Sequence, residues 1–138
     1  MTADEWEYAA SPLATQRVLF SKAWLTGALS SFSHTLVIHD CYDVLSGLRL
    51  IRAIGHTRGH QAVLVNMAEG NICVTGDIVN SLESFAAPTP CRINISVTEA
   101  LAPLEKIRSN AMRVLMRHDT TLTKYRSSGF PRIEDDRS

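Results

Sequence analysis

The sequence has little of what marks a protein that binds nucleic acid or a membrane surface. Acidic and basic residues balance at 14 each, and aromatic residues make up only 7% of the 138-residue chain. A neutral chain without a basic cluster has no electrostatic means of attracting nucleic acid or anionic lipid. The sequence also lacks an apolar run near the roughly 20 residues that a membrane-spanning helix needs. We therefore expect no nucleic-acid partner and no membrane partner.

Cysteine is scarce and irregularly placed. Cys41, Cys73 and Cys91 are odd in number and form no C-x-x-C pair. This pattern argues against a disulfide framework and for a reducing compartment. Residues 1–7 are mostly polar and acidic, without the basic and apolar segments of a signal peptide. The expected location is therefore the cytoplasm.

The length and the periodic segments predict one α/β domain that spans residues 1–138. Thr2 and Glu5 form a capping pattern, which predicts a helix that runs to about Ala10, and a second helical segment should follow Pro12. The other expected segments are strands at 36–39 and 48–54 with a turn at 40–43 between them, a loop at 84–90, a helix at 97–109, a strand at 112–116 and a helix from 120.

The middle of the chain predicts a β-hairpin. Two runs rich in Val, Ile and Leu flank a short turn that carries Gly70, which is typical of two antiparallel strands. Strand pairing across this turn places His60 beside Asp77 or Ile78, with Cα atoms about 5 Å apart. An imidazole and a carboxylate therefore meet at one end of the hairpin, as a metal site or an acid/base site requires.

His60, Asp77 and His118 are the strongest candidates for a functional site. Each lies at a strand end next to a loop, where sheets commonly place their chemistry. His56 lies in a glycine-flanked turn and is expected to support a neighbouring side chain. The remaining two histidines lie in or beside a β run, where a structural role is the more common one. From spacing alone, three unrelated polar residues at strand ends remain an alternative.

These residues resemble a known pattern. The segments 55–65, 75–77 and 117–119 are similar to the second half of the metallo-β-lactamase superfamily, whose pattern is a T-P-G-H-T-P-G-H turn, a strand, a G-D pair and a late histidine. Residues 6–9 and Gln61 are most similar to the N-acyl-homoserine-lactone lactonases and related hydrolases. The resemblance implies an αββα sandwich, of which this chain supplies a partial, mostly antiparallel sheet with flanking helices.

The resemblance also implies a site with two zinc ions. His60 would be a ligand of the first ion, His118 a ligand of the second, and Asp77 the catalytic carboxylate that bridges both. His56 and Asp119 would support these ligands without contacting metal. The implied reaction is hydrolysis of a small-molecule ester, lactone or amide by metal-activated water.

Two departures from the family pattern bear on this site. Ile54 and Arg58 stand where the family usually has proline, which loosens the turn and adds a charge near the site. The H-x-H-x-D-H motif, which supplies the other four ligands in the family, occurs nowhere in the sequence. The chain therefore resembles only the C-terminal portion of the fold, starting after that motif, and we expect a truncated hydrolase that is weakly active or inactive alone.

A partial sandwich has a further consequence, because the sheet face that would meet the other half is apolar. Such a face favours self-association, or pairing with a complementing N-terminal half. The alternative function is thus a non-catalytic fragment or interaction protein that pairs through this face. A third possibility is that His60, Asp77 and His118 together bind one structural metal ion.

Overall fold

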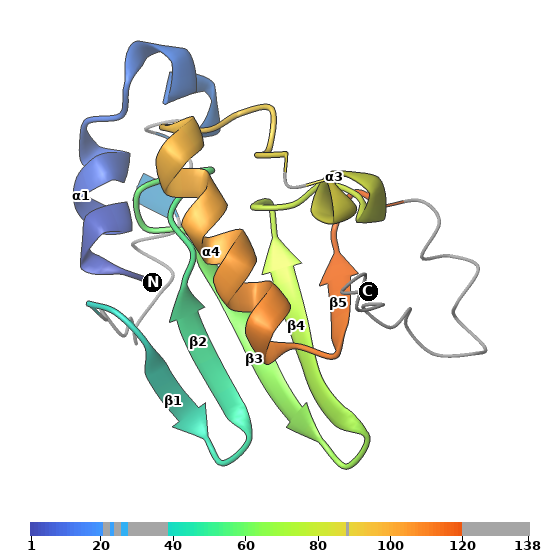
Figure 1. The fold of residues 1–138 in the computed structure, drawn as a ribbon. Coiled ribbons are helices and arrows are strands. Elements are labelled where there is room, and N and C mark those ends of the chain that lie inside the picture. Colours follow the sequence, from blue (N-terminus) through green and yellow to red (C-terminus); the bar gives the residue numbers. More distant parts are fainter. Residues whose placement is uncertain (21–22, 24–25, 28–38, 88, 120–138) are drawn as a thin grey trace.

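The structure is a computed structural model, which describes residues 1–20, 23, 26–27, 39–87 and 89–119 (Figure 1). The elements are α1 (Ala3–Ala10), the 3₁₀ helix η1 (Ala14–Leu19), β1 (Tyr42–Leu45), β2 (Leu48–Arg52), β3 (Gln61–Met67), β4 (Gly70–Gly76), α3 (Leu82–Ala86), α4 (Val97–Asn110) and β5 (Arg113–Met116). Among the described residues, no helix is long and apolar enough to cross a membrane.

The five strands form one sheet in the order β1-β2-β3-β4-β5. The first four strands pair antiparallel with their neighbours along the chain, and β5 pairs parallel with β4. The parallel pair is possible because α3 and α4 connect β4 to β5 and return the chain to the other end of the sheet. The predicted α+β architecture, a mostly antiparallel sheet with flanking helices, is confirmed.

The hydrophobic core lies between the sheet and α4, which crosses in front of the strands in Figure 1. Ala100, Leu104 and Ile107 form the buried face of α4, with at most 1% of each residue exposed. Alternate side chains of the strands point to the same face of the sheet, and those that face α4 join this cluster, including Cys73 and Val114. Each fully buried Leu or Ile stabilises the fold by roughly 1.5–3 kcal/mol relative to an exposed one. The core therefore fixes the sheet that carries the candidate residues.

The predicted helix at the chain start is confirmed, with Thr2 as its N-cap. Thr2 Oγ1 accepts a hydrogen bond from the backbone N–H of Glu5 at 3.1 Å. The helix after Pro12 begins as a 3₁₀ helix, η1, instead of an α-helix. The predicted helix 97–109 is found as α4, and Ser96 is its N-cap.

Two expected segments are wrong. The turn expected at 40–43 overlaps a strand, β1, whose four residues are all exposed and therefore lack the alternation that identifies strands from sequence. The loop expected at 84–90 begins inside α3, a five-residue helix too short to show a helical period. Residues 36–38 of the expected first strand and the expected final helix from 120 lie outside the described residues.

Candidate functional site

The candidate residues converge at one edge of the sheet. His60 immediately precedes β3, Asp77 immediately follows β4, and His118 lies two residues after β5. Because β3 is antiparallel and β5 parallel to β4, the start of β3 and the ends of β4 and β5 share this edge. The hairpin register pairs Met67 with Gly70. Its extension sets His60 opposite Asp77, the first of the two positions that the sequence predicts.

The contact between His60 and Asp77 runs through the backbone. The backbone N–H of Asp77 donates to Nε2 of His60 at 3.1 Å. Gly76, just before Asp77, has a φ of +61°, and a Cβ built there would lie 2.8 Å from the same Nε2. A side chain at this position would therefore be strained and would also displace the imidazole. The glycine of the G-D pair allows the His60 ring to approach the end of β4.

The Asp77 carboxylate is the hub of the site. Its Oδ1 lies 3.0 Å from Nε2 of His118, and its Oδ2 accepts a hydrogen bond from Nη1 of Arg117 at 3.3 Å. Nε2 of His56 lies 4.0 Å from Oδ2. The Asp77 side chain is 24% exposed, whereas those of His118 and Arg117 are 55% and 69% exposed. The pairs with His118 and Arg117 are therefore partly screened by water and contribute at most about 1 kcal/mol each.

His60 is the most electrostatically perturbed residue of the site. Burial, with a smaller contribution from His56, lowers the pKa of His60 to about 4, although Asp77 and the Ala53 backbone act in the opposite direction. The imidazole is therefore neutral at pH 7. Since Nε2 accepts the N–H of Asp77, the ring proton lies on Nδ1, which is buried and makes no well-formed hydrogen bond to any described residue.

His56 faces two groups that the sequence did not point to. Its Nδ1 lies 2.9 Å from the carbonyl oxygen of Ile93 and 3.9 Å from the Sγ of Cys91. The Cys91 thiol also donates to Ile93 O at 2.9 Å, and burial, aided by Asp77, raises the pKa of the thiol to about 11. Cys91 is therefore a protonated neighbour of the site at neutral pH and not a nucleophile.

Asp119 contacts a different element from the one that its predicted role suggests. Its Oδ2 accepts a hydrogen bond from the backbone N–H of Leu82 at 2.7 Å, at the start of α3. This bond ties the end of β5 to the helix that follows β4. Support of the metal ligands by Asp119 stays a prediction.

The donor chemistry of the site suits zinc, but the arrangement does not. Imidazole nitrogen and carboxylate oxygen are common zinc ligands. Within residues 1–20, 23, 26–27, 39–87 and 89–119, no three His, Cys, Asp or Glu side chains are arranged to hold an ion. His60 Nε2 accepts a backbone hydrogen bond, and His118 Nε2 contacts the Asp77 carboxylate directly. In this arrangement, His60, Asp77 and His118 do not fit a pair of zinc ions.

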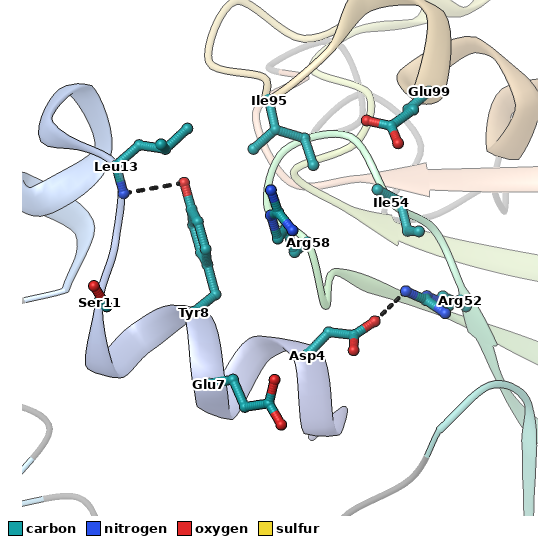
Figure 2. A pocket seen from close by; sticks show the side chains of 10 residues that line it. All are labelled: Asp4, Glu7, Tyr8, Ser11, Leu13, Arg52, Ile54, Arg58, Ile95 and Glu99. Atoms are coloured by element: carbon teal, nitrogen blue, oxygen red, sulfur yellow. Dashed lines mark hydrogen bonds and ion pairs between the residues drawn. The ribbon is translucent and has the colours of Figure 1, made fainter.

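A pocket of about 460 Å³ lies between α1, the turn after β2 and the start of α4 (Figure 2). Arg58, which belongs to the same turn as His56 and His60, lies with its guanidinium 5.8 Å from the ring centroid of Tyr8. The lining carries two arginines, three carboxylates and several aliphatic side chains, and its charges do not select one class of ligand.

Comparisons by sequence find no relative, since no protein-family model and no curated protein match the chain. Solved structures do match. A quorum-quenching N-acyl homoserine lactone lactonase has a TM-score of 0.69 and 17% identity, over 94% of this chain and 53% of its own. A dizinc quorum-quenching lactonase with bound product has a TM-score of 0.68 and 14% identity, over 99% of this chain and 51% of its own. A probable metal-dependent hydrolase from Staphylococcus aureus has a TM-score of 0.68 and 13% identity, over 86% and 43%.

The chain has part of the metallo-β-lactamase fold. It spans about half the length of the solved structures that it matches, because 43–53% of each of these three chains is covered. The likeness, at 13–17% identity, shows the fold and leaves the activity to be argued from the site. The predicted partial sandwich is thus confirmed as a fold.

Proposed function

We propose that this chain supplies one flank of a metallohydrolase site that acts on a small-molecule ester or lactone, and that alone it has little or no activity. The observation that carries the proposal is the position of Asp77 at the end of β4, with His60 and His118 within hydrogen-bonding distance of it. The fold supports the same conclusion, because the matching structures include lactonases and a probable metal-dependent hydrolase.

Since His60, Asp77 and His118 alone do not fit a pair of zinc ions, we propose that a metal site would form only with further ligands. In such a completed site, two zinc ions would share Asp77, and His60 and His118 would each hold one of them. A catalytic zinc ion normally takes three protein ligands and keeps one open position, where it lowers the pKa of bound water to about 7. His60, Asp77 and His118 supply too few ligands for two such ions. The other ligands would have to come from a different segment or chain, so we expect zinc to bind this chain only weakly.

The test is to titrate zinc into the chain and to assay hydrolysis of N-acyl homoserine lactones and simple esters. Asp77→Asn should weaken zinc binding by more than roughly 10- to 100-fold, the loss typical of a residue that only supports a ligand, because it removes the shared carboxylate charge. The matched control is Asp43→Asn, since Asp43 is exposed and pairs with Arg49 in the β1–β2 hairpin. Turnover at the rate of a complete lactonase, with stoichiometric zinc, would overturn the proposal of a half-site. Zinc binding that ignores Asp77 would overturn the proposal of a metal site.

A second candidate function is that of an interaction protein, which the sheet face opposite α4 favours. The strand register aligns Leu50, Val63, Val74 and Leu115 in one row across four strands. Each of these residues adjoins a core residue in sequence, so its side chain points to the opposite face. A sheet that is apolar on both faces normally packs against a further layer on each. We propose that a second copy or a complementing half covers this face.

Size-exclusion chromatography and sedimentation measure the oligomeric state and so test whether a second copy covers this face. Pairing with a second copy predicts a dimer at micromolar concentrations of the 138-residue chain. Val63→Glu on the row should shift the chain toward monomer by burying an unpaired charge, whereas Glu105→Lys on the exposed side of α4 should leave the dimer intact. A stable monomer over the whole concentration range would count against pairing with a second copy.

The proposed compartment remains the cytoplasm. Cys41, Cys73 and Cys91 are free thiols. Burial raises the pKa of Cys73 to about 12, so this thiol is protonated and inert. Free cysteines without a disulfide framework suit a reducing compartment.

A further inference from the structure

The residue before His60 is held on both of its backbone groups by the first turn of α1. The carbonyl oxygen of Gly59 accepts a hydrogen bond from Oγ1 of Thr2 at 2.9 Å. The N–H of Gly59 donates to Oε2 of Glu5, also at 2.9 Å. Thr2 is completely buried although its side chain is polar, so this contact lies inside the protein. Two side chains from the start of the chain thus hold one peptide segment more than 50 residues away.

These contacts exceed what the helix cap itself requires. As N-cap of α1, Thr2 needs only to accept the N–H of Glu5, which its hydroxyl does. In a capping box, the Glu5 carboxylate would turn back to the N–H of Thr2. Here the carboxylate reaches outward to Gly59 instead. The hydroxyl proton and the carboxylate are therefore both used to hold the turn that carries His60.

The fit at Gly59 leaves no room for a side chain. A Cβ built there would lie 2.0 Å from Thr2 Oγ1 and 2.4 Å from the backbone nitrogen of Glu5. The second contact is with backbone, which cannot move aside as a flexible side-chain end can. Glycine is thus required by the close approach of α1, since the turn would otherwise be pushed away from the helix.

Two further contacts hold α1 against the same stretch of chain (Figure 2). Asp4 forms an ion pair with Arg52 at the end of β2. Tyr8, one turn further along α1, lies under the guanidinium of Arg58 in the turn. Contacts from α1 therefore fix the chain at residues 52, 58 and 59, on the N-terminal side of His60.

We propose that α1 acts as a brace that positions the His60 ring, with Thr2 and Glu5 as its positioning residues. The backbone of His60 is tied on its other side, since its carbonyl accepts the N–H of Ala53 at 2.8 Å. With Gly59 and the His60 carbonyl both held, the His60 ring accepts the N–H of Asp77 at 3.1 Å. The meaning of this brace for zinc binding and hydrolysis rests on the proposed function, whereas its effect on the ring position does not.

The test is the amide signal of Asp77, because this N–H donates to the His60 ring. In ¹H–¹⁵N spectra of the full chain, Thr2→Val and Glu5→Met should shift the Asp77 resonance and speed its hydrogen exchange at least tenfold. Thr2→Ser keeps the hydroxyl and Glu5→Gln keeps an acceptor oxygen, so both should resemble the parent within twofold. Ser96→Ala removes the equivalent cap hydroxyl of α4, which accepts from Glu99, and serves as the control for general destabilisation.

An unchanged Asp77 amide in both Thr2→Val and Glu5→Met would overturn the brace. An equal change in Ser96→Ala would overturn it as well, because the effect would then be one of stability alone. Should Thr2→Val fail to fold, Glu5→Met decides, since Glu5 is only half-buried and its replacement leaves the cap hydroxyl in place. Zinc titration of the same variants is a separate measurement. If the parent chain binds no zinc, the proposed function fails, while the Asp77 amide still decides the brace.

Discussion

The lowered pKa of His60 predicts that the fold loses stability as the pH falls below neutrality. The folded-state pKa is about 4, against an ordinary value of 6.5. The unfolded chain therefore binds a proton between these pH values that the folded chain excludes. The contribution of neutral His60 is fully present above pH 6.5 and is lost progressively as the pH falls to 4. Each pKa unit corresponds to about 1.4 kcal/mol, so the loss from pH 7 to 4 should be about 3 kcal/mol.

The assay is urea denaturation at a series of pH values between 7.5 and 3.5, as an order-of-magnitude check on this loss. Other groups also titrate in this range, so the prediction concerns the difference between the parent and His60→Gln. His60→Gln should flatten the decline by about 2–3 kcal/mol, because glutamine has no proton to bind. The control His118→Gln replaces an imidazole that is 55% exposed and should keep the part of the decline that belongs to His60. Equal slopes for the parent and His60→Gln would refute the reasoning.

Two further predictions concern packing. Gly76→Ala should destabilise the chain by about 1–3 kcal/mol, because φ is +61° and the new Cβ would meet His60 Nε2. Gly27→Ala should not destabilise the chain, because a Cβ there would have no atom of the described residues within 4 Å. Equal denaturation midpoints for the two variants would contradict this. Leu104→Ala should lower the free energy of unfolding by about 2–5 kcal/mol, because it opens a cavity under α4. Leu13→Ala, at a half-exposed position, should lower it by less than about 1 kcal/mol. Similar losses for the two variants in chemical denaturation would show that α4 does not cover the core.

The sequence was informative where the local pattern is long enough to repeat. The β3–β4 hairpin could be predicted because two apolar runs flank a glycine turn, and α4 because its apolar residues recur over 14 residues after a serine cap. β1 could not, because its four residues are all exposed and do not alternate, and α3 could not, because its five residues span little more than one helical turn and cannot show a repeat. Each of these short elements depends on partners elsewhere in the chain, such as the ion pair between Asp43 and Arg49.

The same distinction holds for the site. The approach of His60 to Asp77 follows from strand pairing, which is a local consequence of the hairpin. The contacts of Cys91 with His56 and of Arg117 with Asp77 depend on how the loop before α4 and the end of β5 pack, and no spacing rule encodes them. The contacts of the brace with Gly59 could not be predicted from sequence for the same reason, although the capping pattern of Thr2 and Glu5 already singled out both side chains.

The two sides of the Asp77 hub differ in how firmly they are held. His60 is enclosed between two glycines, Gly59 against α1 and Gly76 at the end of β4, and neither position has space for a Cβ. His118 and Arg117, in contrast, reach Asp77 through pairs in which they are more than half exposed, and such pairs contribute at most about 1 kcal/mol each. An ion or a partner chain that approaches Asp77 would therefore break the contacts of His118 and Arg117 with the carboxylate and leave His60 in place. A preset residue of this kind is what a binding site needs, since the cost of ordering it is met when the chain folds and not when the ligand binds.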